Sequence, residues 1–107
     1  QIYALLEKPG ITTLETALAN ENIVVDDDMV LLEVGQALIN ENKPEKAQLL
    51  YQYYTKAFPK IVVAWNDMGD VYRMLHNNAA AKKCYQQALA LRPGNPRATE
   101  NMEKLKE

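Results

Sequence analysis

The sequence has 107 residues, of which 48% are hydrophobic and 24% are charged, and it contains only four glycines and five prolines. A chain of this length and composition can bury a core of its own, which excludes a disordered tail and favours one helical domain. No apolar run approaches the roughly 20 residues of a membrane-spanning helix, so we expect no membrane span. The single cysteine, Cys84, excludes an internal disulfide and is expected to pack as a small apolar side chain.

Charge is distributed unevenly along the chain. Residues 1–53 carry nine acids and three bases, and residues 54–107 carry five acids and nine bases, which gives formal charges of −6 and +4. Solvated helix faces are the simpler explanation, although such a dipole can also orient a charged partner or favour head-to-tail contacts between copies. If these charges recognise a partner, we expect Arg73, Arg97 and Lys104 to bind an acidic segment at the basic end.

Two short apolar stretches open the chain, and Pro9-Gly10 separates them as a turn signal. Their spacing predicts helices near residues 1–8 and 11–21 that cover the open face of the units that follow. The chain begins at Gln1 without a methionine or a signal-peptide pattern, which indicates a processed protein or an excised piece of a longer one.

A period of 34 residues organises the rest of the chain, because residues 28–61 align with residues 62–95. Four of the seven matched pairs are identical and the others remain apolar. The pairs are Leu31 with Trp65, Val34 with Met68, Gly35 with Gly69, Leu38 with Tyr72, Ala47 with Ala81, Tyr51 with Tyr85, and Pro59 with Pro93.

Within the second unit, the spacing predicts two antiparallel helices that pack closely. Each helix carries one stripe of residues at helical spacing, and a polar break around His76 separates the two stripes. Rings on one helix can fill the space above Gly or Ala on the other, and Pro93 ends the second helix. The stripes are Trp65, Met68, Gly69 and Tyr72, followed by Ala81, Tyr85 and Ala88.

The same pattern predicts helices near residues 27–41, 44–57, 62–75 and 79–91, followed by a polar capping helix near residues 96–106. Pro44 and Pro96 suit first-turn positions of two of these helices. The acidic run Asp26-Asp27-Asp28 places negative charge at a helix start, and Met29-Val30-Leu31 after it lacks the oxygen ligands and glycine of a calcium loop.

Most parts of an enzyme are missing from the sequence. It has no serine, one histidine and isolated glycines, so it offers neither a serine nucleophile nor a phosphate-binding loop. Asp67 and Asp70 could pair as acid and base, but their neighbours Asn66 and Arg73 indicate a solvated polar face. The isoelectric point near 5.4 argues against nucleic acid. We therefore expect no catalytic residue, cofactor, metal or nucleic-acid partner.

These residues resemble a tetratricopeptide repeat, complete in residues 62–95 and weaker in residues 28–61, where Tyr54 replaces the small residue typical of the family. The resemblance implies an all-α fold of about seven helices, with antiparallel helix pairs stacked as a short right-handed superhelix. It implies a single domain, 1–107, divided into covering helices 1–27, a first repeat 28–61, a second repeat 62–95 and a capping helix 96–107.

The resemblance also implies a non-catalytic protein–protein interaction module that binds a peptide or protein segment in its concave groove. The family's carboxylate clamp would need Lys at Leu32 and Asn at Gln36, so it is not expected here. Apolar Met29, Leu32 and Ile39 suit either a hydrophobic ligand or the N-terminal helices. The implied groove residues are Met29, Leu32, Gln36, Ile39, Asn40, Val63, Asn66, Asp70, Arg73, Met74, Arg97, Glu100 and Lys104.

The whole chain is also similar to the C-terminal helical extension of some bacterial serine hydrolases of the esterase or β-lactamase type. The similarity rests on Tyr3 to Gly10, Leu32-Glu33-x-Gly35, and Phe58-Pro59 with Trp65 to Tyr72. It implies a structural, regulatory or dimerising extension in the bacterial cytoplasm or periplasm, with the catalytic domain upstream of Gln1. The partner would then be that upstream domain or a second copy, and sequence alone leaves both readings open.

Overall fold

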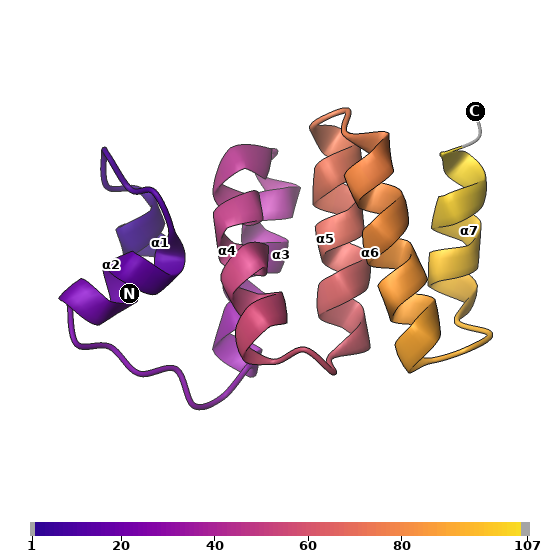
Figure 1. Cartoon of the computed structure of the whole chain (residues 1–107). Coiled ribbons are helices and arrows are strands. Elements are labelled where there is room, and N and C mark those ends of the chain that lie inside the picture. Colours follow the sequence, from indigo (N-terminus) through magenta and orange to yellow (C-terminus); the bar gives the residue numbers. More distant parts are fainter. Residues whose placement is uncertain (1, 106–107) are drawn as a thin grey trace.

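In the computed structural model, which describes residues 2–105, the chain folds into seven α-helices, and this part of the chain contains no strand (Figure 1). The expected all-α class is therefore confirmed. Three terminal residues lie outside the described part of the chain: Gln1, Lys106 and Glu107. The sequence predicts that they belong to the first helix, the last helix and the capping segment, respectively. The helices are α1 (Ile2–Leu6), α2 (Leu14–Asn20), α3 (Met29–Asn40), α4 (Pro44–Ala57), α5 (Val62–Met74), α6 (Asn78–Leu91) and α7 (Pro96–Lys104).

The helix starts follow local capping chemistry. α2 begins three residues later than expected because the hydroxyl of Thr13 accepts a hydrogen bond from the backbone N–H of Thr16 at 3.1 Å and fixes the start there. α7 begins behind Asn95, whose side chain accepts hydrogen bonds from two backbone N–H groups. Two aspartates before α3 accept different hydrogen bonds. Oδ1 of Asp27 accepts from the backbone N–H of Met29 at 3.0 Å, and Oδ2 of Asp28 accepts from the hydroxyl of Tyr54 at 2.7 Å.

From α3 to α7 the helices stand side by side, and each packs against its neighbour in the chain (Figure 1). The first helices of successive units also contact one another, α3 with α5 and α5 with α7. These first helices therefore form a common face, which is the face on which the resemblance places a groove.

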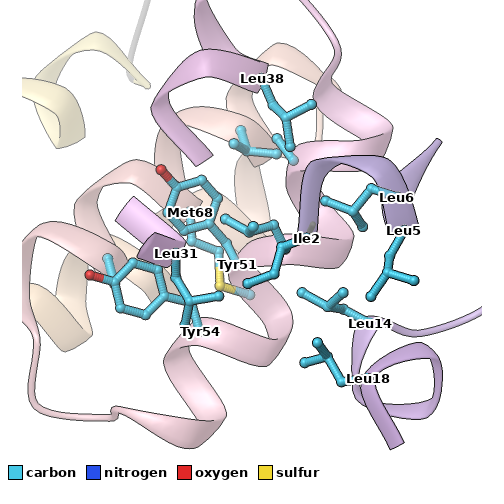
Figure 2. Close-up of a cluster of buried hydrophobic side chains, with 14 of the residues drawn as sticks. Ile2, Leu5, Leu6, Leu14, Leu18, Leu31, Leu38, Tyr51, Tyr54 and Met68 are labelled. Atoms are coloured by element: carbon cyan, nitrogen blue, oxygen red, sulfur yellow. The ribbon is translucent and has the colours of Figure 1, made fainter. Parts of the chain in front are cut away.

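The N-terminal pair packs on the first unit, with α1 against α3 and α4, and α2 against α4. Five of its side chains are at most 5% exposed, and they belong to the same core cluster as Leu31, Tyr51 and Tyr54; Figure 2 shows Ile2 next to Tyr51. Burying one such side chain contributes about 1.5 to 3 kcal/mol, so this contact is part of the core. The five are Ile2, Leu5, Leu6, Leu14 and Leu18.

Ion pairs surround this apolar contact. Glu7, just after α1, lies 2.7 Å from Nζ of Lys46, and Glu15 of α2 lies 2.9 Å from Nζ of Lys56. The hydrogen bond from Lys46 lowers the pKa of Glu7. Acids of the N-terminal segment thus pair with bases of α4, which accounts for part of the uneven charge without a partner.

Each repeat unit contains the same close contact between a glycine on its first helix and a tyrosine on its second. A Cβ added to Gly69 would lie 2.7 Å from Cδ1 of Tyr85, and a Cβ added to Gly35 would lie 2.5 Å from Cζ of Tyr51. Real Cβ atoms do not approach other atoms so closely, so both helix pairs need glycine at this point.

The structure places the predicted packing residues at three levels of exposure. Val34, Trp65 and Tyr72 are half-buried, and Pro59 and Pro93 are exposed beyond the ends of α4 and α6. The remaining ten are buried: Leu31, Gly35, Leu38, Ala47, Tyr51, Met68, Gly69, Ala81, Tyr85 and Ala88.

Tyr54 does not disturb the packing at the position where the first unit departs from the family pattern. It is fully buried, stacks on Tyr51 with ring centroids 5.9 Å apart, and meets Phe58 edge to face at 6.2 Å. The large ring fits because its hydroxyl reaches Asp28 at the start of α3.

Candidate functional site: a pocket on the face of the first helices

A pocket of about 280 Å³ lies where α3, α5 and α7 meet on their common face. Each of these three helices contributes side chains to it, so it exists only because the units are stacked. Its lining residues are Gln36, Ile39, Asn40, Asp67, Asp70 and Arg97. A second hollow, of about 220 Å³, lies within the N-terminal pair and involves none of the predicted groove positions.

Arg97 of α7 crosses to two carboxylates of α5. Its Nη2 atom donates to Oδ1 of Asp67 at 2.6 Å and to Oδ2 of Asp70 at 2.7 Å. The Asp67 side chain is only 4% exposed, whereas Arg97 is 41% exposed. Burial without a partner would make a charged Asp67 costly, so the guanidinium is a structural requirement of α5 as well as part of the pocket wall.

Two tyrosine hydroxyls complete the contacts of these carboxylates. Tyr51 of α4 donates to Oδ2 of Asp67 at 2.8 Å, and Tyr85 of α6 donates to Oδ1 of Asp70 at 2.5 Å. Desolvation, followed by the interaction with the neighbouring aspartate, raises the pKa of both tyrosines. Both therefore remain neutral donors at physiological pH.

The charges around the pocket balance. Desolvation opposes the charged form of Arg97, but hydrogen bonds to Asp70 and Asp67 outweigh it, and the pKa of Arg97 is raised. Arg73 joins the same cluster, with Nη2 at 3.8 Å from Oδ1 of Asp70 and Nη1 at 3.4 Å from the side-chain oxygen of Asn101. With two aspartates and two arginines, the formal charge of this cluster is zero.

Opposite this cluster, α3 supplies a neutral wall. Gln36 and Asn40 are exposed, and within residues 2–105 their side chains make no hydrogen bond. Each amide can donate and accept, which matches the alternating N–H and C=O groups of a peptide backbone. Ile39 between them is half-buried and gives the wall an apolar part.

The structure brings five of the predicted groove residues together around the pocket: Gln36, Ile39, Asn40, Asp70 and Arg97. The other eight do not line it. Met29 is 53% exposed at the start of α3, and Leu32 packs against the core. Of the remainder, Val63, Arg73 and Met74 are half-buried, Asn66 is buried, and Glu100 and Lys104 are exposed.

Two expectations from the sequence are wrong. Asn66 and Asp67 do not form a solvated face, because each residue, backbone included, is only 2% exposed. Nor do Arg73 and Arg97 form an unpaired basic end, because both contact Asp70. The arginines and Asp67 were misjudged for the same reason, since residues of α5 and α7 pair across the pocket, whereas Oδ1 of the buried Asn66 has no hydrogen-bond partner among the described residues.

Sequence reasoning missed the roles of Asp67 and Tyr51 in this site. The position of Asp67 is polar in each successive unit, with Glu33 before it and Asn101 after it. Asp67 and Asn101 are both buried. Glu33 is exposed, so the polar residue that returns at the repeat period marks a buried position only in the second and third units.

Other site chemistries find no support in the described part of the chain. Residues 2–105 contain no group of three or more His, Cys, Asp or Glu side chains able to hold a metal ion. Among the same residues, every helix is too short or too polar to span a bilayer. Burial raises the pKa of Cys84 to about 11, in keeping with a packed thiol.

Comparison with known proteins agrees with the stacked helix pairs. The family model of the tetratricopeptide repeat matches residues 62–95. The chain is 39% identical over 61 residues, 56% of its length, to Tetratricopeptide repeat protein 5 of Bos taurus. It is 29% identical over 85 residues, 76% of its length, to Tetratricopeptide repeat domain-containing protein PYG7, chloroplastic, of Arabidopsis thaliana. The matches span only 14% and 28% of these relatives. Residues 62–95 therefore match the tetratricopeptide repeat, and the seven-helix fold is consistent with repeats of this type.

Proposed function

We propose that the chain is a non-catalytic protein–protein interaction module that binds an extended peptide or protein segment in the pocket between α3, α5 and α7. The observation that carries this proposal is the pocket itself, which lies on the shared face of the first helices and contains five predicted groove residues. A pocket of this size holds one residue of a bound segment and its flanking peptide groups, so neighbouring exposed positions would contribute the remaining contacts.

The lining favours a peptide over a small charged ligand. Gln36 and Asn40 offer donors and acceptors to a peptide backbone, and Ile39 offers an apolar surface. The charged residues of α5 and α7 are already paired with one another. The segment would lie across α3, α5 and α7, where main-chain hydrogen bonds supply affinity and side chains supply selectivity.

The test begins with a random peptide library displayed on phage, selected against the whole chain. For the selected peptides, dissociation constants are measured by fluorescence anisotropy with the wild-type chain and with a Gln36→Ala, Asn40→Ala double variant. Both side chains are exposed, so the double variant should fold normally. We expect it to bind at least about tenfold more weakly, because it removes two central polar contacts.

The matched control is a Gln86→Ala, Gln87→Ala double variant on α6, where both glutamines are exposed and lie outside the pocket. It should bind the selected peptides as the wild-type chain does. Equal loss of affinity in both double variants, or none in the first, would contradict the proposed location of the groove. Failure to select any peptide would contradict peptide binding by this chain.

A further inference from the structure

The inference that follows rests on the proposed function and gives the pocket a ligand chemistry. We propose that Asp67 and Asp70 turn Arg97 into a fixed, charge-balanced hydrogen-bond donor, so that the pocket accepts an uncharged peptide amide and rejects a carboxylate. The basis is the placement of one guanidinium between two carboxylates on the wall of a pocket whose other wall is neutral.

The first step concerns the donors of Arg97. Both of its hydrogen bonds to the aspartates use Nη2, and within residues 2–105 its Nε and Nη1 donate no side-chain hydrogen bond. The guanidinium is planar with five N–H donors, so fixing Nη2 at two points also fixes the direction of the remaining three. Because the side chain is 41% exposed, part of this fixed donor set is accessible to a ligand.

The second step concerns charge. The positive charge of Arg97 is already offset by Asp67 and Asp70 at 2.6 and 2.7 Å. A ligand carboxylate at Nη1 would lie a few ångströms from both aspartates, and like charges at such separations repel strongly in a partly desolvated site. A carbonyl oxygen at the same place would gain a hydrogen bond to a charged donor without that repulsion.

The third step concerns the opposite wall. A peptide group that accepts from Arg97 carries an N–H that needs an acceptor of its own. Gln36 and Asn40 line the same pocket, and their side-chain oxygens, which accept no hydrogen bond within residues 2–105, can accept it. Donor and acceptor on facing walls match an amide, whereas a carboxylate would leave the acceptors of α3 unused.

The proposal predicts that one charge sets the selectivity. In Asp67→Asn the side-chain oxygen can still accept from Arg97, and the new amide can donate to the hydroxyl oxygen of Tyr51, so size and hydrogen bonds are retained. The cluster of Asp70, Arg73 and Arg97 then carries a formal charge of +1. We expect the affinity for a carboxylate to rise about tenfold, while the affinity for an amide changes little.

The experiment uses two small probes, sodium acetate and N-acetylglycine N-methylamide, titrated separately into the ¹⁵N-labelled chain. The signals followed are the side-chain amides of Gln36 and Asn40, assigned by substitution. Asp26→Asn is the matched control, since it removes the same charge from the exposed linker before α3. Asp70→Asn is a second test variant, in which the altered aspartate is more exposed than Asp67.

The expected result is that the wild-type chain and Asp26→Asn respond to the amide more strongly than to acetate, and that Asp67→Asn or Asp70→Asn gains an acetate response. Three outcomes would overturn the inference: acetate binding by the wild-type chain at least as tight as amide binding, no gain in either test variant, or an equal gain in Asp26→Asn. The inference is also overturned if neither probe shifts the side-chain amide signals of Gln36 and Asn40. The peptide selection is scored separately, so peptide binding can stand when this ligand chemistry fails.

Discussion

The two repeat units contain the same glycine–tyrosine contact but use the tyrosine hydroxyl differently. In the first unit, Tyr51 lies over Gly35 and donates to Asp67, which belongs to the second unit. In the second unit, Tyr85 lies over Gly69 and donates to Asp70 on the preceding helix of the same unit. The packing of the tyrosine ring on glycine is therefore the same in both units, whereas the hydroxyl bonds to the next unit in one case and within its own unit in the other.

The first prediction fills the space that both glycines leave. Gly69→Leu and Gly35→Leu force a side chain into Tyr85 and Tyr51, and overpacking of this kind costs about 1 to 3 kcal/mol or more. Removing a glycine from mid-helix returns about 1 kcal/mol, so a net loss in urea unfolding identifies the clash. Ala90→Leu, at an exposed position of α6, is the control. A leucine at either glycine that leaves the midpoint unchanged would show that the shared contact is not tight.

The next effect separates the two hydroxyls. Tyr51→Phe leaves an oxygen of the buried Asp67 without its donor, which should cost about 1.5 to 3 kcal/mol of unfolding free energy. Tyr85→Phe should cost only about 0.5 to 1.5 kcal/mol, because Asp70 is 22% exposed and keeps Arg97 and Asn101 as donors. Chemical denaturation of both variants measures the difference. Equal losses, or a greater loss for Tyr85→Phe, would remove the distinction between the two bonds.

A pH titration sharpens the same comparison. Burial, followed by an interaction with an aspartate, raises the pKa of Tyr51, Tyr54 and Tyr85 above the ordinary value of 10.0. Their contribution to stability is fully present below pH 10 and is lost as the pH rises further, because the unfolded chain then releases protons that the folded chain retains. The loss by pH 11 should be at most about 1 kcal/mol per tyrosine after solvent screening.

Urea midpoints between pH 8 and pH 11, with tyrosinate absorbance as the probe of ionisation, test this prediction. Tyr51→Phe and Tyr85→Phe should each flatten the alkaline decline, and Tyr53→Phe, at a half-buried position of α4, serves as the control. A decline that is identical in all three variants would mean that other groups cause it.

The smallest effect concerns the N-terminal pair. Glu15 and Lys56 form an ion pair between side chains that are 60% and 72% exposed, so Glu15→Gln should change the unfolding free energy by less than about 0.5 kcal/mol. Leu14→Ala, on the same helix and buried, should cost about 2 to 5 kcal/mol in the same assay and provides the contrast. A large loss from Glu15→Gln would show that charge, and not apolar packing, holds α2 to α4.

The repeat made most of the fold predictable. Glycine, alanine and aromatic residues at a fixed period determine where helices begin, end and approach, and α4 spans the residues expected for it. α2 differed because the hydroxyl of Thr13 fixes its start, and residue spacing does not report such a bond. The division into the four segments, the groove as a binding site and the resemblance to a hydrolase extension stay predictions.

The buried state of Asp67 could not be predicted in the same way. It depends on Tyr51, 16 residues earlier, and on Arg97, 30 residues later, and neither partner is identified by helical spacing. An aspartate beside an asparagine and three residues before another aspartate appears solvated until the neighbouring helices are placed. The pairing of charges between helices is therefore the part of such a site that can be identified only from the three-dimensional structure.

The stacking of helices in chain order, described above, also has a kinetic consequence. Because most helix contacts join neighbours in the chain, the sequence separation between contacting residues is small, and domains with such local contacts fold on the microsecond to millisecond scale. In a stacked array the outermost helix has one neighbour fewer, so opening begins at the end. Amide protons of α7 should exchange with solvent before those of α5. Because Arg97 of α7 is hydrogen-bonded to Asp67 of α5, this bond must break before α7 can open on its own.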